Sequence, residues 1–97
     1  MTIRKEQNGG ALDIAPEGRL DTTTAPELEA ELKNLEGVTE LTFDLAGLEY
    51  ISSAGLRVLL SAQKMMNKQG SMIILNTRPE IMDIFEITGF TDILNIQ

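Results

Sequence analysis

The sequence contains no cysteine and no histidine among its 97 residues. Without cysteine there is no disulfide framework or thiolate site, and without histidine the commonest proton shuttle and metal ligand are missing. These absences exclude most catalytic mechanisms. The chain also lacks an apolar run long enough to span a membrane, and Met1 to Asn8 is polar and charged, unlike a secretory signal. We therefore expect a cytoplasmic protein without a metal, a cofactor or a membrane attachment.

Positive charge is scarce as well. The chain has eight Lys and Arg residues and fifteen Asp and Glu residues, which gives a formal net charge of -7. Such a surface repels nucleic acid and anionic lipid, and it favours a partner with a basic face. The hydrophobic fraction of 42% and the charged fraction of 24% are ordinary for a globular protein. Because 97 residues can form one core but not two, we expect a single domain over residues 1–97.

The first third of the chain predicts a β-hairpin followed by a helix. Two weakly alternating segments flank the turn sequence Asn8-Gly9-Gly10, and the second should end or bulge at Pro16, which has no backbone N–H. Thr24 and Glu27 have the spacing of a capping box, in which each side chain bonds the other residue's amide. Apolar residues at helical spacing then predict an amphipathic helix that stops at Gly37.

Strands and helices alternate in the rest of the chain. The period of two in residues 41–45 predicts a strand, and residues 47–51 are interpreted as a connection to a helix that runs from the serines at 52 and 53 to near Gly70. An isoleucine-rich strand is predicted at 71–75, and a third helix is predicted from Pro79 to Gly89. Residues 93–96 form either a last strand or a packed tail.

This order predicts an α/β fold. Two hairpin strands followed by alternating helices and strands give a mixed sheet of four or five strands with parallel βαβ units and helices on at least one face. Functional residues in such sheets collect where strands run into helix N-termini, and the clearest such junction is the segment from Asp44 to Gly55. There Ser52 or Ser53 can cap the helix, and the first-turn amides can also hold an anion. Spacing alone leaves both interpretations open.

The whole segment from Phe43 to Leu60, centred on Ser52-Ser53-Ala54-Gly55, resembles the signature of the STAS domain family, which sulfate transporters and anti-sigma factor antagonists share. Two further elements support the resemblance. Gly18-Arg19-Leu20-Asp21 is similar to the family's glycine and aspartate element before its first helix, and residues 84–90 are similar to its closing helix and turn. The likeness covers nearly the whole chain.

The resemblance implies a phosphorylation switch. In antagonists of this family the modified serine or threonine lies two positions before the motif glycine, which is Ser53 here. Many of these antagonists have aspartate immediately before that residue, whereas this chain has Ser52, a second and less favoured acceptor. The resemblance also implies two partners, a serine kinase that doubles as the anti-sigma factor and a metal-dependent serine phosphatase. The residues expected at the partner surface are Asp21, Ser52, Ser53, Ala54, Gly55 and Arg57.

Other side chains have structural interpretations. Asp21 and Asp44 are better read as turn aspartates that bond nearby amides than as an acid–base pair or metal site, although the family places the Asp21 element beside the switch. Met66 is expected in the core, and Met65 beside it is either core or an adaptable contact. Gly55 is expected to let a partner backbone approach the first helical turn.

Three classes of function remain. The first is a regulatory module that binds a kinase-like anti-sigma factor and releases it when Ser53 is phosphorylated. The second is a stand-alone STAS domain that senses a small ligand or serves as a signalling scaffold. The third, an enzyme with Ser53 as nucleophile, is disfavoured because no histidine or cysteine is present and no lysine forms a recognisable serine–lysine motif. We therefore expect a protein that is not an enzyme.

Overall fold

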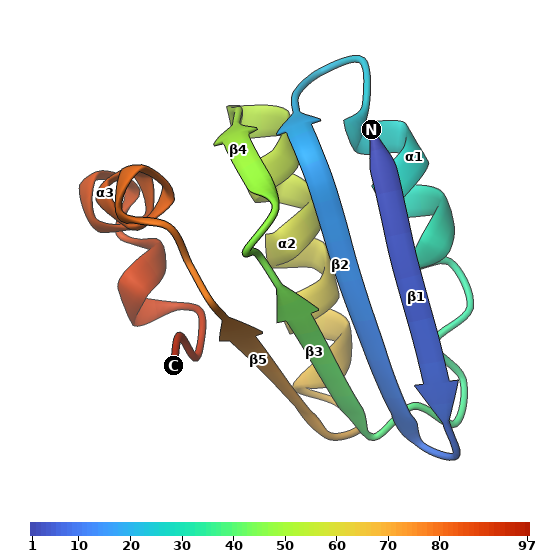
Figure 1. Ribbon diagram of the computed structural model, residues 1–97. Helices are drawn as coiled ribbons and strands as arrows, with labels where there is room; N and C mark the ends of the chain where they lie inside the picture. The colour runs from blue at the N-terminus through green and yellow to red at the C-terminus, as the bar shows by residue number, and fades with distance from the viewer.

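A computed structural model describes residues 1–97, and it contains one sheet with helices against it (Figure 1). The strands are β1 (Thr2–Asn8), β2 (Ala11–Leu20), β3 (Glu40–Asp44), β4 (Leu48–Ile51) and β5 (Ser71–Leu75). The helices are α1 (Ala25–Glu31), α2 (Ser53–Met66), α3 (Pro79–Thr88) and the short 3₁₀ helix η1 (Phe90–Asp92). None of these helices combines the length and the apolar run that crossing a bilayer requires. The mixed five-stranded sheet and the N-terminal hairpin confirm the predicted fold class.

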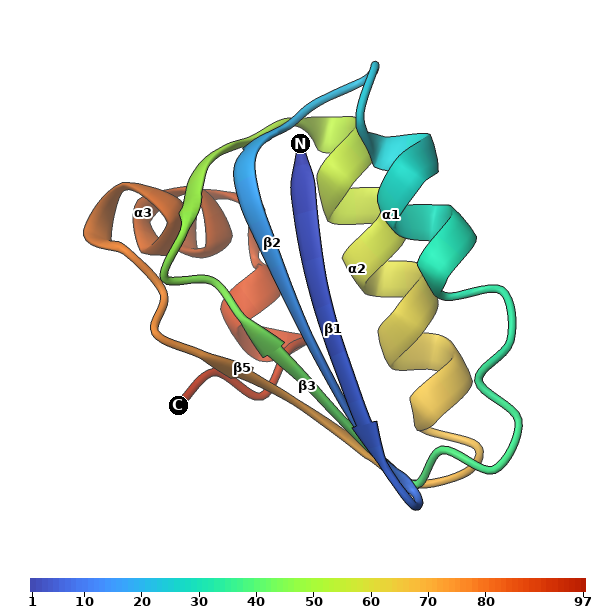
Figure 2. The same cartoon turned by 45° about the vertical axis from the view of Figure 1, so that its right-hand side comes forward.

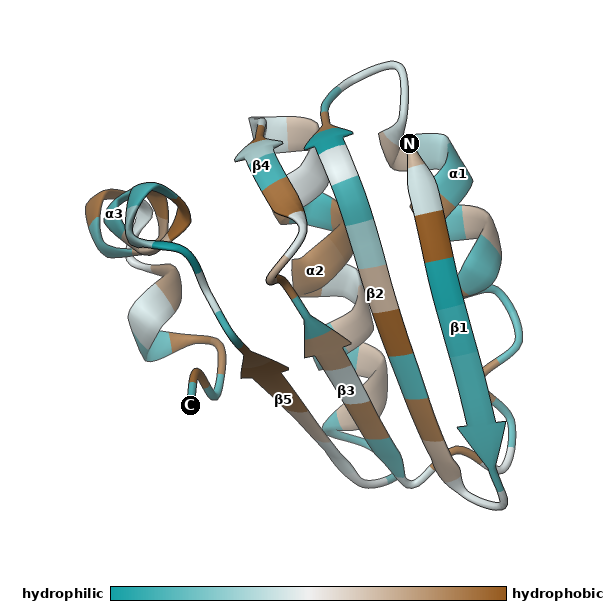
Figure 3. Cartoon of the chain, in the orientation of Figure 1, coloured by the Kyte–Doolittle hydropathy of each residue, from teal (hydrophilic) through white to brown (hydrophobic).

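The strand order is β1-β2-β3-β5, and β4 pairs with the far half of β2. β1 runs antiparallel to β2, whereas β3, β4 and β5 all make parallel pairs. α1 and α2 lie together on one face of the sheet, and α3 lies beyond β4 (Figure 2). The hydropathy colouring separates the polar strand β1 from the apolar strand β5 at the other side of the sheet (Figure 3). This arrangement aligns the carboxyl ends of β2 and β4 beside the N-terminus of α2.

The core lies between the sheet and its helices. Alternate residues of β2 and β3, such as Leu12, Ile14, Leu41 and Phe43, are buried on the helix side. Twenty-three buried apolar residues form one continuous cluster, which is why α1 and α2 need their amphipathic stripes. Phe85 of α3 joins the same cluster and extends it past β4.

The interpretation of residues 47–51 as a connection was wrong, because residues 48–51 form β4. Leu48 and Ile51 are buried while Glu49 and Tyr50 between them are exposed, so the strand lacks a period of two. The cause is a register shift, in which Gly18 pairs with Leu48 but Arg19 pairs with Tyr50. One residue of β4 is therefore extra, as in a β-bulge.

The prediction that β2 ends or bulges at Pro16 was also wrong, because the strand continues to Leu20. The Gly18 amide donates to the Gly47 carbonyl (2.9 Å), so the nitrogen of Pro16, two residues earlier, faces the same side of β2. Pairing with β3 ends at Ile14 and pairing with β4 begins at Gly18. Pro16 thus occupies the gap where no N–H is needed.

α1 begins after Thr24, as predicted, but its capping and its end differ from the prediction. Thr24 makes no capping bond from its side chain, so the predicted capping box is absent. The helix ends at Glu31, and Gly37 lies in the following loop with a positive φ of 82°. Leu35 is buried although it lies beyond the helix end, so the apolar pattern continues past the helix into the loop.

The later elements follow the prediction more closely. α2 begins at Ser53 but ends at Met66, before Gly70. α3 begins at Pro79, and Gly89 ends it in the left-handed conformation with a φ of 79°. Of the two alternatives for residues 93–96, the packed tail is correct, because its only strand-like contact is the isolated bridge between Ile96 and Ile74 of β5.

Candidate functional site

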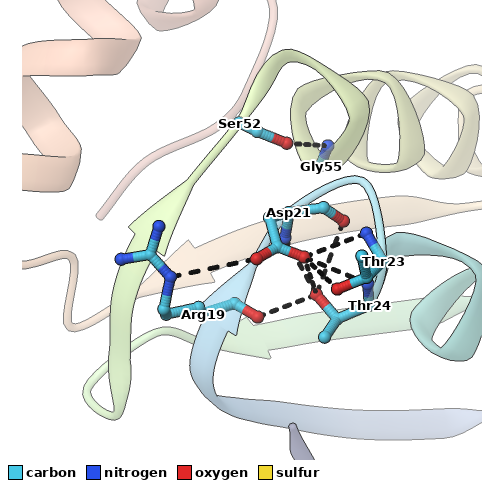
Figure 4. A network of polar contacts seen from close by, with 6 residues as sticks. All are labelled: Arg19, Asp21, Thr23, Thr24, Ser52 and Gly55. Atoms are coloured by element: carbon cyan, nitrogen blue, oxygen red, sulfur yellow. Dashed lines mark hydrogen bonds and ion pairs between the residues drawn. The ribbon is translucent and has the colours of Figure 1, made fainter.

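The candidate site lies where β2 and β4 end side by side. Leu20 and Ile51 are parallel partners, and the Ser52 amide donates to the Leu20 carbonyl (2.9 Å). The next residue on each strand is therefore Asp21 on one side and Ser52 on the other. Figure 4 shows the hydrogen bonds around Asp21 next to the first turn of α2. Two segments that are far apart in sequence thus form one surface.

The two serines have different positions. Ser52 is the N-cap of α2, and its Oγ accepts a hydrogen bond from the Gly55 amide (3.5 Å). Ser53 is the first residue of the helix and is exposed, and its hydroxyl forms no hydrogen bond. The predicted position of Ser53, accessible at a helix N-terminus, is confirmed. The amides of Ser53 and Ala54 have no intrahelical acceptor, and no acidic residue lies in this first turn.

Asp21 organises the turn that leads into α1. Its Oδ1 accepts from the Thr23 hydroxyl (2.7 Å), the Thr23 amide (3.0 Å) and the Thr24 amide (3.2 Å). The Thr24 hydroxyl accepts from the Asp21 amide and donates to the Arg19 carbonyl, both at 2.8 Å. Asp21 therefore stabilises the turn before α1, and the Thr24 side chain, which was predicted to cap the helix, bonds this turn to the end of β2 instead.

The hydrogen bond from the Thr23 hydroxyl is the main reason that the pKa of Asp21 lies below its usual value of 3.8. Burial acts in the opposite direction, and the amides of Thr23 and Thr24 add to the lowering. A carboxylate with a lowered pKa stabilises the folded state fully above its unfolded-state pKa, and this contribution is lost as the pH falls through the folded-state pKa. The turn beside Ser53 should therefore weaken only in acid.

We expect Asp21→Asn to lower the melting temperature at pH 7, with a deficit that is constant down to about pH 5 and shrinks below about pH 4. The measurement is thermal unfolding of both proteins across this range. Asp13→Asn is the matched control, because Asp13 is exposed in β2 and accepts no hydrogen bond. A deficit for Asp21→Asn that did not change between pH 7 and pH 3 would contradict this account of the turn.

Sequence reasoning missed Arg19 and Tyr50. These residues are strand partners, and the Arg19 guanidinium carbon lies 4.2 Å from the centroid of the Tyr50 ring. The Arg19 Nε is also 3.8 Å from Asp21 Oδ2, in a loose and largely exposed ion pair. Recognising residues 48–51 as a strand parallel to β2 would have predicted the contact, since it follows from the register.

Gly55 does not have the predicted role of offering an open approach to a partner. It is buried, and a Cβ added there would lie 2.7 Å from Leu20 Cγ and 2.8 Å from Ile51 Cγ1. Glycine is needed because α2 packs closely on the ends of β2 and β4. Ala54 is half-buried and Arg57 is exposed, so these two predicted contact residues are accessible on the outside of α2.

The remaining candidates are separate from this surface. Asp44 lies at the end of β3, where its Oδ1 accepts from the Ala46 amide (3.0 Å) and from Asn76 Nδ2 (3.1 Å). Both aspartates thus bond nearby amide groups, as predicted, and no group of three possible metal ligands exists in the chain. Met66 is fully buried in the core, which confirms its predicted position, whereas Met65 is 37% exposed.

The whole chain is similar to known proteins of one family. The family model of the STAS domain matches residues 2–97. A Bordetella bronchiseptica protein named as an anti-sigma factor antagonist, BtrV, is 35% identical over 99 residues, which cover 99% of this chain and 85% of that protein. The anti-sigma-B factor antagonist of Bacillus subtilis is 33% identical over 98 residues, covering 99% of this chain and 90% of the relative.

Solved structures show the same fold. The anti-sigma factor antagonist SpoIIAA in its unphosphorylated form superimposes with a TM-score of 0.78 at 18% identity, covering 99% of this chain and 87% of that protein. The phosphorylated form of Bacillus SpoIIAA gives the same TM-score at 19% identity, covering 99% and 91%. At this level of identity the likeness concerns the fold, and the fold is equally close to both forms.

Proposed function

Because the chain belongs to the STAS domain family, we propose that it is an anti-sigma factor antagonist switched by phosphorylation of Ser53. Unphosphorylated, it binds a kinase-like anti-sigma factor and so releases a sigma factor. When Ser53 is phosphorylated, the complex with the anti-sigma factor dissociates. The observation that carries this proposal is the exposed, unbonded hydroxyl of Ser53 at the first position of α2, where β4 ends beside the Asp21 turn of β2.

Ser53 is the better acceptor of the two serines. The Ser52 hydroxyl is half-buried and holds the Gly55 amide, so modification there would remove the cap of α2. The Ser53 side chain has no such role, and phosphate at a helix N-terminus meets free amides and a favourable dipole. A kinase can therefore modify Ser53 without breaking an internal bond.

The chemistry belongs to the partners. The Ser53 oxygen attacks the terminal phosphorus of a nucleoside triphosphate bound to the kinase, the bond from that phosphorus to the diphosphate breaks, and a base of the kinase takes the hydroxyl proton. A metal-dependent phosphatase reverses the modification by hydrolysis, which releases inorganic phosphate. This chain supplies the hydroxyl and the docking surface, and we place the whole cycle in the cytoplasm.

The switch acts at the interface, without refolding the domain. Phosphate adds a charge of about -1.5 to -2 and a hydration shell to a position that the partner must approach closely. SpoIIAA, a protein with the same fold, is equally similar to this chain in its phosphorylated and unphosphorylated forms. This supports a mechanism in which the fold persists while the contact is blocked.

Phosphate transfer tests the assignment of Ser53. We expect the cognate kinase-like anti-sigma factor, supplied with ATP, to phosphorylate the wild type and Ser52→Ala stoichiometrically and to leave Ser53→Ala unmodified. Intact-mass measurement with peptide mapping locates the phosphate. Ser52→Ala is the matched control, since it removes the neighbouring hydroxyl and only the capping bond to Gly55. Phosphorylation of Ser53→Ala to the wild-type level would show that the acceptor is elsewhere.

A further inference from the structure

The positive charge of this acidic chain is concentrated in one part of the sequence. Residues 50–79 contain no Asp or Glu but include half of the eight cations, namely Arg57, Lys64, Lys68 and Arg78. This segment therefore has a charge of +4 in a chain of -7, and the remaining residues together carry -11. Three of these cations lie on α2 or in the turn directly after it.

The cations of α2 share a face with the switch serine. Ser53, Arg57, Ser61 and Lys64 fall within about 80° of arc at 3.6 residues per turn, and Lys68 follows in the next turn of the chain. All five side chains are exposed, on a helix that packs on the sheet beside α1 (Figure 2). We call this set the cationic stripe, and it begins at Ser53 itself.

None of the three cations in the stripe has an intramolecular partner. Every salt bridge in the structure is made by another cation, each with its own carboxylate; these four cations are Arg4, Lys5, Arg19 and Arg78. A surface helix is commonly stabilised by about 0.2–0.5 kcal/mol for each oppositely charged pair three or four residues apart, but α2 has no acidic residue to form one. The stripe therefore does not serve the helix through ion pairs.

The helix dipole explains only part of the stripe. Lys64 lies in the last turn and Lys68 just beyond it, where a cation is favourable. Arg57, however, is five residues into the helix, nearer its positive end, where a cation has no such advantage. The first turns of α1 and α3 contain Glu27 and Glu80, whereas that of α2 contains no acid.

The stripe also borders a depression that a partner could enter. A groove of about 530 Å³ lies between α1 and α2, and its lining includes Arg57, Ser61 and Lys64 on the α2 side. Ala25 and Val58 contribute apolar surface, and Glu29 of α1 is the single acidic residue in the lining. Cationic side chains above a partly apolar groove fit a protein surface that combines carboxylates with apolar side chains.

We propose that the cationic stripe docks an acidic surface of the same protein partner that contacts Ser53, an inference that rests on the proposed function. The stripe would speed association and orient the partner along α2, with its acidic groups opposite Arg57, Lys64 and Lys68. Phosphate on Ser53 would add negative charge at the head of the stripe and so weaken the same attraction. The partner is thus acidic where it meets α2, contrary to the basic partner expected from the net charge of -7.

The test removes two cations far from the switch. We expect Lys64→Gln combined with Lys68→Gln to lower the affinity for the anti-sigma factor by about tenfold at low salt, mainly through slower association, and to flatten its dependence on salt. The matched control, Asn8→Asp with Gln97→Glu, makes the same change of net charge at exposed positions outside α2. The control should bind within about twofold of the wild type. Thermal unfolding checks that both variants are folded.

The outcomes separate this proposal from the function on which it rests. If the wild type binds and Ser53→Asp does not, but the double lysine variant binds like the control, the stripe proposal is wrong and the proposed function stands. If the wild type fails to bind the anti-sigma factor, both are wrong. Retention of the wild type on phosphatidylglycerol vesicles or duplex DNA, lost in the double lysine variant, would assign the stripe to a different class of partner and overturn the proposal.

Discussion

Replacing Ser53 by aspartate is expected to lower the affinity for the anti-sigma factor by about a hundredfold, which corresponds to 2–3 kcal/mol of coupling. The residue is exposed at the first position of α2, so the added carboxylate meets the partner directly. It also meets the positive end of the helix, which favours a negative charge there. The melting temperature should therefore stay the same or rise slightly while binding is lost. Calorimetric titration and thermal unfolding measure the two effects.

Ser52→Asp provides the matched control, because it adds the same charge one residue earlier. Aspartate is a good N-cap, and it can keep the bond that Ser52 makes with the Gly55 amide. We expect this variant to bind within about threefold of the wild type. Ser53→Ala should also bind well. Equal losses for Ser52→Asp and Ser53→Asp would show a general effect of charge, and loss of binding together with a collapsed melting curve would show unfolding in place of an interface effect.

Gly55 substitutions should act on stability. A Cβ at this position lies under 3 Å from carbons of Leu20 and Ile51. Overpacking of this kind costs about 1–3 kcal/mol, whereas replacing glycine by alanine inside a helix gains about 1 kcal/mol. Gly55→Ala should therefore lower the free energy of unfolding by up to about 2 kcal/mol, or the melting temperature by up to roughly 16 °C. Gly55→Leu, with three further carbons, should lose more than about 3 kcal/mol.

Denaturant unfolding measures these losses, and Ser61→Ala on the exposed face of the same helix is the control. Ser61 is exposed, so this change should alter the free energy of unfolding by less than about 0.5 kcal/mol. Folded Gly55→Ala should bind the anti-sigma factor as the wild type does. A more stable Gly55→Ala with weakened binding would mean that the glycine faces the partner after all.

Gly55 shows which features of the site can be predicted from a sequence motif and which cannot. The motif placed Ser53 and Gly55 correctly at the start of α2, because the start of an apolar-periodic helix follows from local sequence. The direction in which Gly55 faces depends on Leu20 and Ile51, which are brought there by tertiary packing. A local pattern can require a glycine without saying whether the neighbour is the protein's own core or a partner.

In the fold, too, some elements could be predicted from local sequence and others could not. The hairpin turn at Gly9, the start of α3 at Pro79 and its end at Gly89 all depend on backbone constraints that the residues carry themselves. The missed strand β4 and the continuation of β2 through Pro16 depend on pairing between distant segments. Local patterns do not contain this information, since a bulged strand has no simple period and a proline is tolerated only where no neighbouring strand needs its N–H.

The turn at Asp21 shows how far the hydrogen bonds of the candidate site could be predicted from the sequence. Thr24 and Glu27 have the spacing of a capping box, but Thr24 makes no capping bond. Instead, the Asp21 carboxylate accepts hydrogen bonds from the amides of Thr23 and Thr24 in the turn before the helix. Local sequence is compatible with both arrangements. In the structure the Thr24 hydroxyl donates to the Arg19 carbonyl near the end of β2, and this orientation turns the side chain away from the first helical turn. The bonding of Asp21 to nearby amides could therefore be predicted from the sequence, but the absence of the Thr24 capping box could not.

The central claim is that Ser53 is phosphorylated in the cell, and mass spectrometry of the protein isolated from its own host tests this most directly. Phosphopeptide mapping of the segment that contains Ser52 and Ser53, with fragment ions between the two residues, assigns the site. The account predicts a phosphorylated fraction at Ser53 that disappears when the gene for the kinase-like anti-sigma factor is deleted. An unmodified Ser53 under all growth conditions, or phosphate found only on Ser52, would contradict it.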